Sequence, residues 1–292
     1  VPDGKLTPEV MNSFGRVSDP QVSPDGKKIL YGVSYTDIAQ NKSNRELFTM
    51  NTDGSDNRQI TSTVKGENNG RWINSGNDIA YITSGEIWVM KSDGSGARKV
   101  SGFEKPVSEF EVSPAGDKIL IISNIPSITR PVDRYPDLDK ATGRMINDLM
   151  YRHWDTFVEE IPHPFVADFN GSSISNVKDI LEGEPYECPT LPLSGIEQLS
   201  WSPDGKFILY ASRKVTGREY AYSTNTDIYL YNIESGKAEN LTEGMFGYDT
   251  DPLFSPDGKQ FAWISMERAG YEADKKRLFV MDLETRVKNE LT

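Results

Sequence analysis

The sequence predicts an all-β protein of the β-propeller class, with about five four-stranded blades present. Two observations support this prediction: a Ser-Pro-Asp-Gly-Lys turn recurs along the chain, and an apolar run typical of a buried strand follows each copy. Proline and glycine supply the backbone angles of a tight turn, and aspartate bonds to nearby backbone groups. Full copies begin at Ser23, Ser202 and Ser255, a variant begins at Ser113, and a weaker copy begins at Asn74.

A second hairpin follows each first one. In the first repeat, the apolar run at 47–51 leads to an Asp-Gly turn and then to a short strand at 58–61. Two hairpins give four antiparallel strands, which is the repeating unit of a propeller. A β-sandwich is the alternative, but sandwiches do not repeat one turn at the same place in a four-stranded unit. The repeats cover about 17–61, 69–101, 107–187, 195–242 and 249–292.

The third repeat contains an insertion, at about 123–164, that does not follow the strand-and-turn pattern. Its first part is rich in proline and is expected to be irregular. Its second part, from Asp139 to Trp154, predicts a helix because apolar residues recur there with helical spacing. A long insertion of this kind is either a functional segment or a lid or brace without chemistry. The apolar residues are Met145, Ile146, Leu149 and Met150.

Residues 1–16 precede the repeats and predict a short helix. Thr7 is suited to cap it, Pro8 to occupy its first position, and Glu9 to lie in its first turn. Val10, Met11 and Phe14 are expected to anchor this helix.

Composition excludes several classes of function. The chain has 292 residues and a formal net charge of -12, which disfavours binding to nucleic acid. It has no stretch of roughly 18 apolar residues, so no membrane span is expected. Cys188 is the single cysteine, which rules out a disulfide framework. Two histidines, His153 and His163, are too few for a typical zinc site, and we expect no metal and no cofactor.

The residues for nucleophilic catalysis are also missing. No Gly-x-Ser-x-Gly sequence occurs, so the nucleophile turn of an α/β-hydrolase is not expected in this chain. Cys188 lies between a glutamate and a proline, a setting that favours the neutral thiol. We therefore expect no catalytic residue and no activity in this chain alone.

Binding remains, and the end of the insertion carries the candidates. Glu159 and Glu160 are adjacent acids that follow Trp154, and two carboxylates near aromatic rings can hold a primary ammonium group such as a peptide N-terminus. Arg152 is suited to bind peptide carbonyl or phosphate-like groups. The alternative is that the two glutamates are a solvated charge pair and that Arg152 only pairs with a neighbouring acid.

Two stretches resemble the prolyl oligopeptidase family. The first combines Leu-Thr-Pro-Glu at 6–9 with Arg-Val-Ser-Asp-Pro-Gln-Val-Ser-Pro-Asp-Gly-Lys at 16–27, and it is similar to the start of that family. The second, Met-Tyr-Arg-His-Trp-Asp at 150–155 followed by His-Pro-Phe-Val at 163–166, resembles its bacterial dipeptidyl-peptidase and acylaminoacyl-peptidase branch. The turn motif by itself is shared by all TolB-like propellers.

The resemblance implies a propeller that restricts access to a serine exopeptidase. In that family an N-terminal propeller covers a C-terminal α/β-hydrolase domain, which carries the Ser-Asp-His triad and is absent here. Residues 1–16 would then be a lead-in and 17–292 the blades, with peptides as substrates. In related dipeptidyl peptidases a glutamate pair on the propeller captures the free amino group, a role that Glu159 and Glu160 would take. The resemblance also implies a periplasmic or secreted location, with which a start at Val1 is compatible, although the sequence leaves the cytoplasm open.

Two other functions stay open. A stand-alone TolB-like propeller could act as a periplasmic scaffold that binds other proteins through the insertion. A carbohydrate-acting propeller lyase is the weaker idea, because its His-rich metal cluster cannot be built from two histidines. Five blades would leave two sheet flanks uncovered in a ring evolved for more, so we also expect a homodimer.

Overall fold

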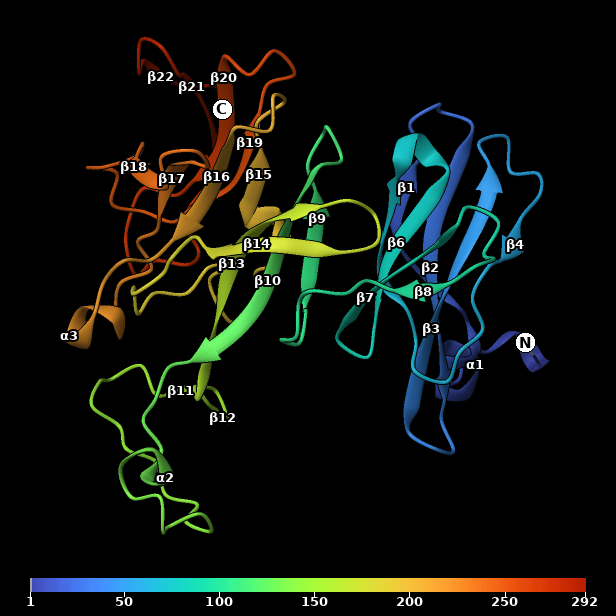
Figure 1. The fold of residues 1–292 in the computed structure, drawn as a ribbon, viewed down its shortest axis with the longest axis horizontal. Coiled ribbons are helices and arrows are strands. Elements are labelled where there is room, and N and C mark those ends of the chain that lie inside the picture. Colours follow the sequence, from blue (N-terminus) through green and yellow to red (C-terminus); the bar gives the residue numbers. More distant parts are fainter. Residues whose placement is uncertain (1) are drawn as a thin grey trace. The chain divides into compact units, whose positions relative to one another are not determined.

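The computed structural model describes residues 2–292, and its regular structure is mainly antiparallel β-sheet (Figure 1). Within these residues, five sheets have four strands each and a sixth has two. Each large sheet takes its strands in the order in which they occur in the sequence. The tandem pairs of hairpins are therefore confirmed as four-stranded sheets. Val1, which is compatible with the expected periplasmic or secreted location, lies outside the described residues.

The chain divides into two compact units. The first unit comprises the chain up to Val112 together with Ala167–Asn176, and the second comprises Ser113–Val166 and Val177–Thr292.

The helical segments of the chain are short, and no helix within residues 2–292 is long and apolar enough to cross a membrane. These segments are η1 (Pro2–Gly4), α1 (Pro8–Ser13), η2 (Asn74–Gly76), α2 (Pro131–Arg134), η3 (Ile196–Gln198) and α3 (Gly217–Tyr220).

The strand bounds follow the predicted repeats closely. The first sheet holds β1 (Arg16–Val22), β2 (Lys28–Asp37), β3 (Lys42–Asn51) and β4 (Arg58–Gln59), and the second holds β5 (Asn68–Ile73), β6 (Asp78–Thr83), β7 (Glu86–Lys91) and β8 (Arg98–Lys99). The third holds β9 (Glu109–Val112), β10 (Lys118–Pro126), β13 (Glu160–Phe169) and β14 (Ile174–Asp179). The fourth holds β15 (Leu199–Trp201), β16 (Phe207–Ser212), β17 (Asp227–Asn232) and β18 (Lys237–Asn240), and the fifth holds β19 (Asp249–Phe254), β20 (Gln260–Ser265), β21 (Arg277–Asp282) and β22 (Lys288–Glu290).

The recurring turn owes its shape to its own side chains. In the fourth sheet, the Ser202 hydroxyl group donates to Asp204 Oδ1 at 2.7 Å, and the same oxygen accepts the Lys206 backbone N–H at 3.1 Å. The Phe207 N–H donates to Ser202 Oγ at 2.9 Å, which closes the turn onto β16. Gly205 has a φ of 69°, a left-handed conformation that glycine adopts without strain. The copies that begin at Ser23 and Ser255 make the same serine–aspartate bond.

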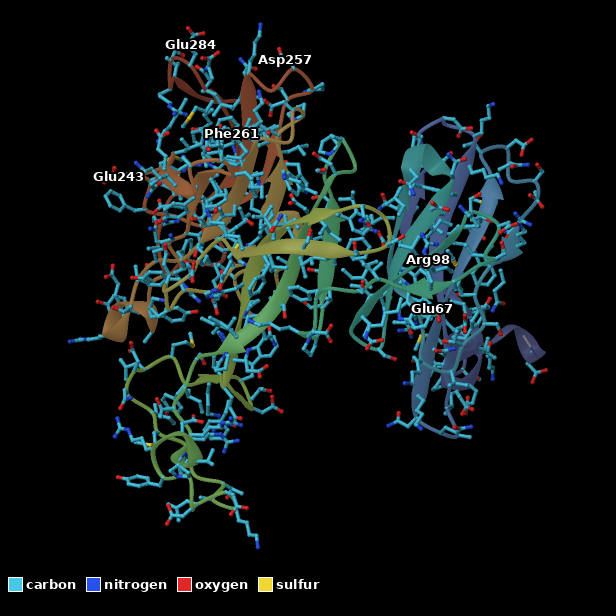
Figure 2. All side chains as sticks on the ribbon, in the orientation of Figure 1. Glu67, Arg98, Glu243, Asp257, Phe261 and Glu284 are labelled. Carbon is cyan, nitrogen blue, oxygen red and sulfur yellow. The ribbon has the colours of Figure 1, made fainter. Side chains whose placement is uncertain are left out.

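Consecutive sheets share an apolar core in each unit. In the first unit, Leu30 and Leu47 of the first sheet pack against Ile79, Tyr81 and Met90 of the second. In the second unit, the fourth and fifth sheets share a core cluster that includes Leu209, Ile228, Phe261 (labelled in Figure 2), Trp263 and Met281. Burial of each such side chain contributes roughly 1.5–3 kcal/mol, so the sheet faces are held mainly by hydrophobic packing.

The N-terminal helix forms as predicted but is not anchored as predicted. Thr7 caps it by accepting the Val10 N–H at 3.4 Å, and Pro8 is its first residue. Met11 and Phe14 are 49% and 55% exposed, and no residue of α1 is buried. The expectation that these side chains anchor the helix is therefore wrong, because they lie on a face that the described residues leave open to solvent.

The predicted helix between 139 and 154 is also wrong. The structure shows turns and irregular chain there, with a single bridge between Thr129 and Met145, and then the small hairpin of β11 (Arg152–His153) and β12 (Thr156–Phe157). Local bonds compete with helix formation, since the Asp148 carboxylate accepts the backbone N–H of Leu149 at 2.6 Å. The segment between β10 and β13 covers 127–159 and is shorter than predicted.

Candidate functional site

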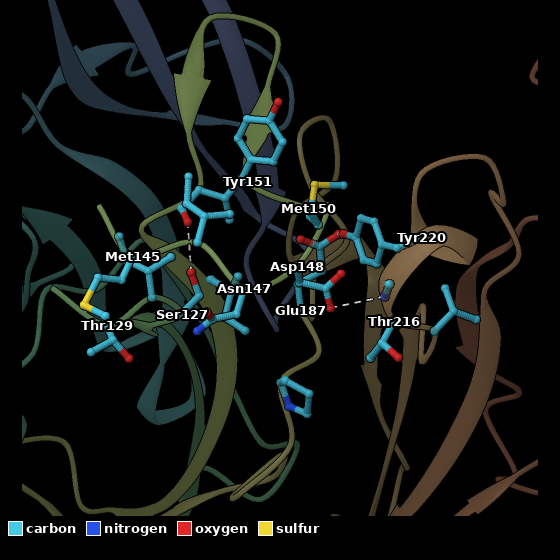
Figure 3. A pocket seen from close by; sticks show the side chains of 17 residues that line it. Ser127, Thr129, Met145, Asn147, Asp148, Met150, Tyr151, Glu187, Thr216 and Tyr220 are labelled. Carbon is cyan, nitrogen blue, oxygen red and sulfur yellow. Dashed lines mark hydrogen bonds between the residues drawn. The ribbon is translucent and has the colours of Figure 1, made fainter. Parts of the chain in front are cut away.

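A cavity of about 210 Å³ lies in the second unit, between the insertion and the segment around α3. Met145, Met150 and Tyr151 of the insertion line one side, and Thr216 and Tyr220 line the other (Figure 3). Met145, Ile146 and Met150, three of the apolar residues that suggested a helix, thus line a cavity instead. The two sides are joined where Asp148 Oδ2 accepts the Gly217 N–H at 3.2 Å.

A buried carboxylate forms part of the cavity wall. Glu187 is 2% exposed, and its Oε1 accepts hydrogen bonds from the Tyr220 hydroxyl group and, at 3.1 Å, from Arg213 Nη2. The Arg213 guanidinium also lies 3.8 Å from the centre of the Tyr220 ring, as in a cation–π contact. Burial and the Glu187 charge raise the pKa of Tyr220, so its hydroxyl group stays protonated and acts as the donor.

The second oxygen of Glu187 has a different neighbour. Oε2 lies 3.9 Å from His153 Nε2, which is too far for a hydrogen bond. His153 Nε2 is buried and has no hydrogen-bond partner within residues 2–292. Buried polar atoms are normally paired, so this nitrogen is suited to bond with a water or ligand atom that reaches it.

The four predicted binding residues lie around the β11–β12 hairpin. Glu159 forms an ion pair with Arg144, whose guanidinium lies 4.1 Å from the centre of the Phe157 ring. Arg152 faces the same ring at 5.3 Å. The charge of Glu159 is therefore compensated by Arg144, whereas the alternative interpretation described the two glutamates as a solvated charge pair.

The other two predicted residues are exposed. The Asn124 amide approaches Glu160 Oε2 at 3.5 Å, which leaves the carboxylate mostly in solvent. Trp154 is 76% exposed and occupies the turn of the hairpin with a φ of 49°. The residues that line the cavity do not include Glu159, Glu160, Arg152 or Trp154.

Sequence reasoning missed the group formed by Glu187, Arg213 and Tyr220. No spacing pattern connects these residues, because they are brought together by the packing of the segment after β14 against α3. No clear signal marks Glu187 in the sequence, since two other acids, Glu182 and Glu184, precede it in the same run. Charged residues are rarely buried unless they are paired, and the partners of Glu187 come from other segments.

Thiol chemistry and metal binding find no suitable site among residues 2–292. Cys188 is fully buried, and this burial raises the pKa of its thiol, so the neutral form dominates. Within residues 2–292, no group of three or more His, Cys, Asp and Glu side chains is placed to hold a metal ion.

Comparison with known proteins points to peptidases. No protein-family model matches the chain. It is 54% identical to dipeptidyl-peptidase 5 of Porphyromonas gingivalis over 284 residues, which covers 96% of this chain and 42% of that protein. It is 44% identical to dipeptidyl-peptidase 5 of Porphyromonas endodontalis, over 94% of this chain and 40% of that protein. The chain thus spans about two fifths of the length of these relatives.

Solved structures show the same fold at low sequence identity. The uncomplexed acylaminoacyl peptidase of Pyrococcus horikoshii matches with a TM-score of 0.67 and 18% identity, over 96% of this chain and 39% of that one. A prolyl endopeptidase structure matches with a TM-score of 0.59 and 13% identity, over 96% of this chain and 36% of that one. With the repeated four-stranded sheets, these matches show a propeller-like fold. In sequence, the chain is similar to the dipeptidyl-peptidases 5 over about two fifths of their length.

Proposed function

We propose that this chain is the substrate-gating and substrate-binding propeller of a serine exopeptidase that acts on short peptides. The observation that carries the proposal is the 54% identity to a dipeptidyl-peptidase 5 over 96% of the chain. Residues 1–16 serve as a lead-in and 17–292 as five blades. The Ser-Asp-His triad lies in a C-terminal α/β-hydrolase domain of the same protein, so this chain alone does not hydrolyse peptides.

Gating follows from the size of the opening that packed sheets leave. A folded protein cannot pass such an opening, whereas a short peptide can enter as an extended chain. The propeller would therefore protect folded proteins and admit peptides. A periplasmic or secreted location and a homodimer belong to this proposal. The stand-alone scaffold has no comparable observation in its favour.

The cavity beside the insertion is the proposed binding site for the start of the peptide. Its walls combine apolar side chains, among them Met145 and Met150, with the buried carboxylate of Glu187. A peptide N-terminus combines an ammonium group with a nearby side chain, and this pairing fits a carboxylate set in an apolar wall. Tyr220 and Arg213 hold Glu187 Oε1, which leaves Oε2 to face the ligand.

The residues of the hairpin take a second role in this proposal. Glu160 is exposed and lies at the start of β13, where it adds negative charge near the route to the cavity. Arg152 and Trp154 are placed to contact the peptide backbone and side chains at the surface. Glu159 contributes less, because it is paired with Arg144 outside the cavity wall.

The test compares the longer gene product with the 292-residue chain, using dipeptidyl chromogenic substrates. We expect hydrolysis by the longer protein only. In the longer protein, Glu187→Gln should raise KM by roughly tenfold or more for substrates with a free amino group, since a bond to a charged group is worth about 1.5–3 kcal/mol. It should change KM little for N-acetylated substrates.

Glu182→Gln is the matched control, because Glu182 is exposed in a nearby turn. Glu160→Gln tests the contribution of the surface separately. Hydrolysis by the 292-residue chain would contradict the assignment of catalysis to a separate hydrolase domain. An equal KM change for free and acetylated substrates would contradict the role of Glu187.

A further inference from the structure

Two carboxyl groups are buried together in the first unit, away from the cavity. Glu46 lies on β3 of the first sheet and is 7% exposed. Glu67, labelled in Figure 2, immediately precedes β5 of the second sheet and is fully buried. Asn44 Nδ2, which donates to Glu46, also donates to the Thr63 carbonyl group at 2.7 Å, and the Thr63 hydroxyl group donates to Glu67, so the same residues hold both carboxyl groups. Two carboxylates cannot hydrogen-bond to each other, so a bond between these groups needs a proton on one of them.

The other partners of the pair are neutral. Asn44 Nδ2 donates to Glu46 Oε1 at 2.6 Å, and the Thr61 hydroxyl group donates to Glu46 Oε2 at 2.9 Å. The Thr63 hydroxyl group donates to Glu67 Oε1 at 2.6 Å. Glu67 Oε2 is buried without a hydrogen-bond partner in the part of the chain that the structure describes. A proton held between the two carboxyl groups would provide the missing donor and remove one of two buried charges.

The neighbouring charged and titratable groups do not provide a positive charge or a proton in place of this one. Tyr81 of β6 faces Glu67, and burial together with the Glu67 charge raises the pKa of Tyr81 to about 12, so it remains neutral. Arg45, next to Glu46 in the chain, lies 3.8 Å from Asp19 of β1. Burial and the neighbouring Glu67 raise the pKa of Glu46, in agreement with the geometry.

The same arrangement recurs in the second unit. The Thr61 hydroxyl oxygen accepts the Leu47 N–H at 2.8 Å, and the Thr242 hydroxyl oxygen accepts the Ile228 N–H at 2.9 Å, so the two threonines hold equivalent positions. Thr242 then donates to a carboxylate, Asp227, at 3.4 Å, as Thr61 does to Glu46.

The next sheet again supplies the second acid. Asp249 begins β19 and is fully buried, its Oδ1 accepts the Trp263 indole N–H at 3.2 Å, and its Oδ2 has no hydrogen-bond partner within residues 2–292. Burial, with a smaller contribution from Asp227, raises the pKa of Asp249. Near Asp227, Glu243 raises and Lys288 lowers the pKa of that carboxyl group.

We propose that the acid pair of Glu46 and Glu67 binds one proton and joins the first and second sheets through it. Asp227 and Asp249 hold a related place in the second unit, where Lys288 lies near Asp227. The contact between the first and second sheets is then pH-sensitive. As the pH rises and the proton leaves, two adjacent buried carboxylates remain without a cation, and the contact between the sheets weakens. This inference is independent of the proposed function, because it concerns the joints between blades and not the peptide site.

Hydrogen exchange of β3 and β5, corrected for the intrinsic rate, tests the first pair in the 292-residue chain. We expect protection to fall at least tenfold between pH 6 and pH 8. In Glu67→Gln, whose amide needs no shared proton, this loss should be mostly absent, whereas the exposed control Glu104→Gln should retain it. An equal loss in all three proteins would overturn the proposal.

Infrared spectroscopy provides a readout that does not depend on the variants folding. The chain with its native sequence should show absorption of protonated carboxyl groups at a pH where exposed carboxylates are ionised, and this band should disappear on further titration. Absence of the band at every pH would overturn the proposal. So would a tightly bound cation that stays with the protein through dialysis, because it would balance the carboxylate charges in place of the proton.

Discussion

The Tyr220 hydroxyl group donates a hydrogen bond to the Glu187 carboxylate, although 33 residues separate the two in the sequence. The bond connects the segment after β14 to α3, and both residues line the cavity. Arg213 reinforces it from the end of β16 by donating to the same carboxylate oxygen. The shape of the proposed peptide site therefore depends on a buried polar contact between parts that are distant in the sequence.

Removing this donor should lower stability. Tyr220→Phe keeps the ring and its contact with Arg213 but leaves Glu187 with one donor fewer, which should cost roughly 1–3 kcal/mol of unfolding free energy. Urea unfolding monitored by fluorescence measures the change. Tyr222→Phe, at an exposed tyrosine, is the control and should have little effect. Equal stability of Tyr220→Phe and the unaltered chain would contradict the structural importance of the bond.

The recurring turn should contribute measurably to each blade. Asp204→Ala removes the acceptor for the Ser202 hydroxyl group and the Lys206 N–H, and we expect a loss of about 0.5–1 kcal/mol because both bonds are near solvent. Asp139→Ala, at an exposed aspartate of the insertion, should be nearly neutral. If the two variants have the same urea midpoint, the turn is fixed by proline and glycine alone.

Two tryptophans provide a contrast between core and surface. Trp263 is fully buried and stacks on Phe261 and Phe279, with ring-centre distances of 4.9 and 5.3 Å. Trp263→Ala should cost about 3–5 kcal/mol through lost burial and the remaining cavity. Trp154→Ala should change stability by less than about 0.5 kcal/mol, because that side chain is exposed. A large loss in Trp154→Ala would indicate that another part of the protein covers it.

Acid should stabilise the second unit through Asp249. Burial raises the pKa of Asp249 from its ordinary value of 3.8 to about 6, so the folded chain binds this proton more tightly than the unfolded chain. Its contribution to stability is therefore fully present below about pH 4, declines as the pH rises to about 6, and is absent above that. The difference is on the order of 2–3 kcal/mol.

Asp249→Asn should flatten this dependence, because the amide does not ionise. Urea midpoints at pH 5 and pH 7.5 measure the effect, and Asp139→Asn provides a control at an exposed aspartate. A pH dependence that is unchanged in Asp249→Asn would show that other groups cause it.

The blades could be predicted from the sequence because their hairpins depend on neighbours in the chain. The expected repeat at 195–242 contains the observed strands from Leu199 to Asn240, and the other repeats agree as well. The insertion could not be predicted in the same way. Its apolar residues have helical spacing, yet Met145, Ile146 and Met150 line a cavity that only the folded chain creates.

The candidate binding residues also differ in whether the local sequence reveals them or only the folded chain does. Glu159 and Glu160 could be found because they are adjacent, but adjacency did not reveal that Arg144 neutralises Glu159. Glu187 could not be found, because its burial and its partners come from other segments.

The sequence alone determined the repeated four-stranded sheets, the cap of α1 and the resemblance to a peptidase family, since turns, alternating strands and sequence motifs are local. Only the tertiary structure decided which acids are buried, which of them lie together and where the cavity forms. The physical reason is that burial and charge pairing depend on distances across packed sheets, which the order of residues does not specify.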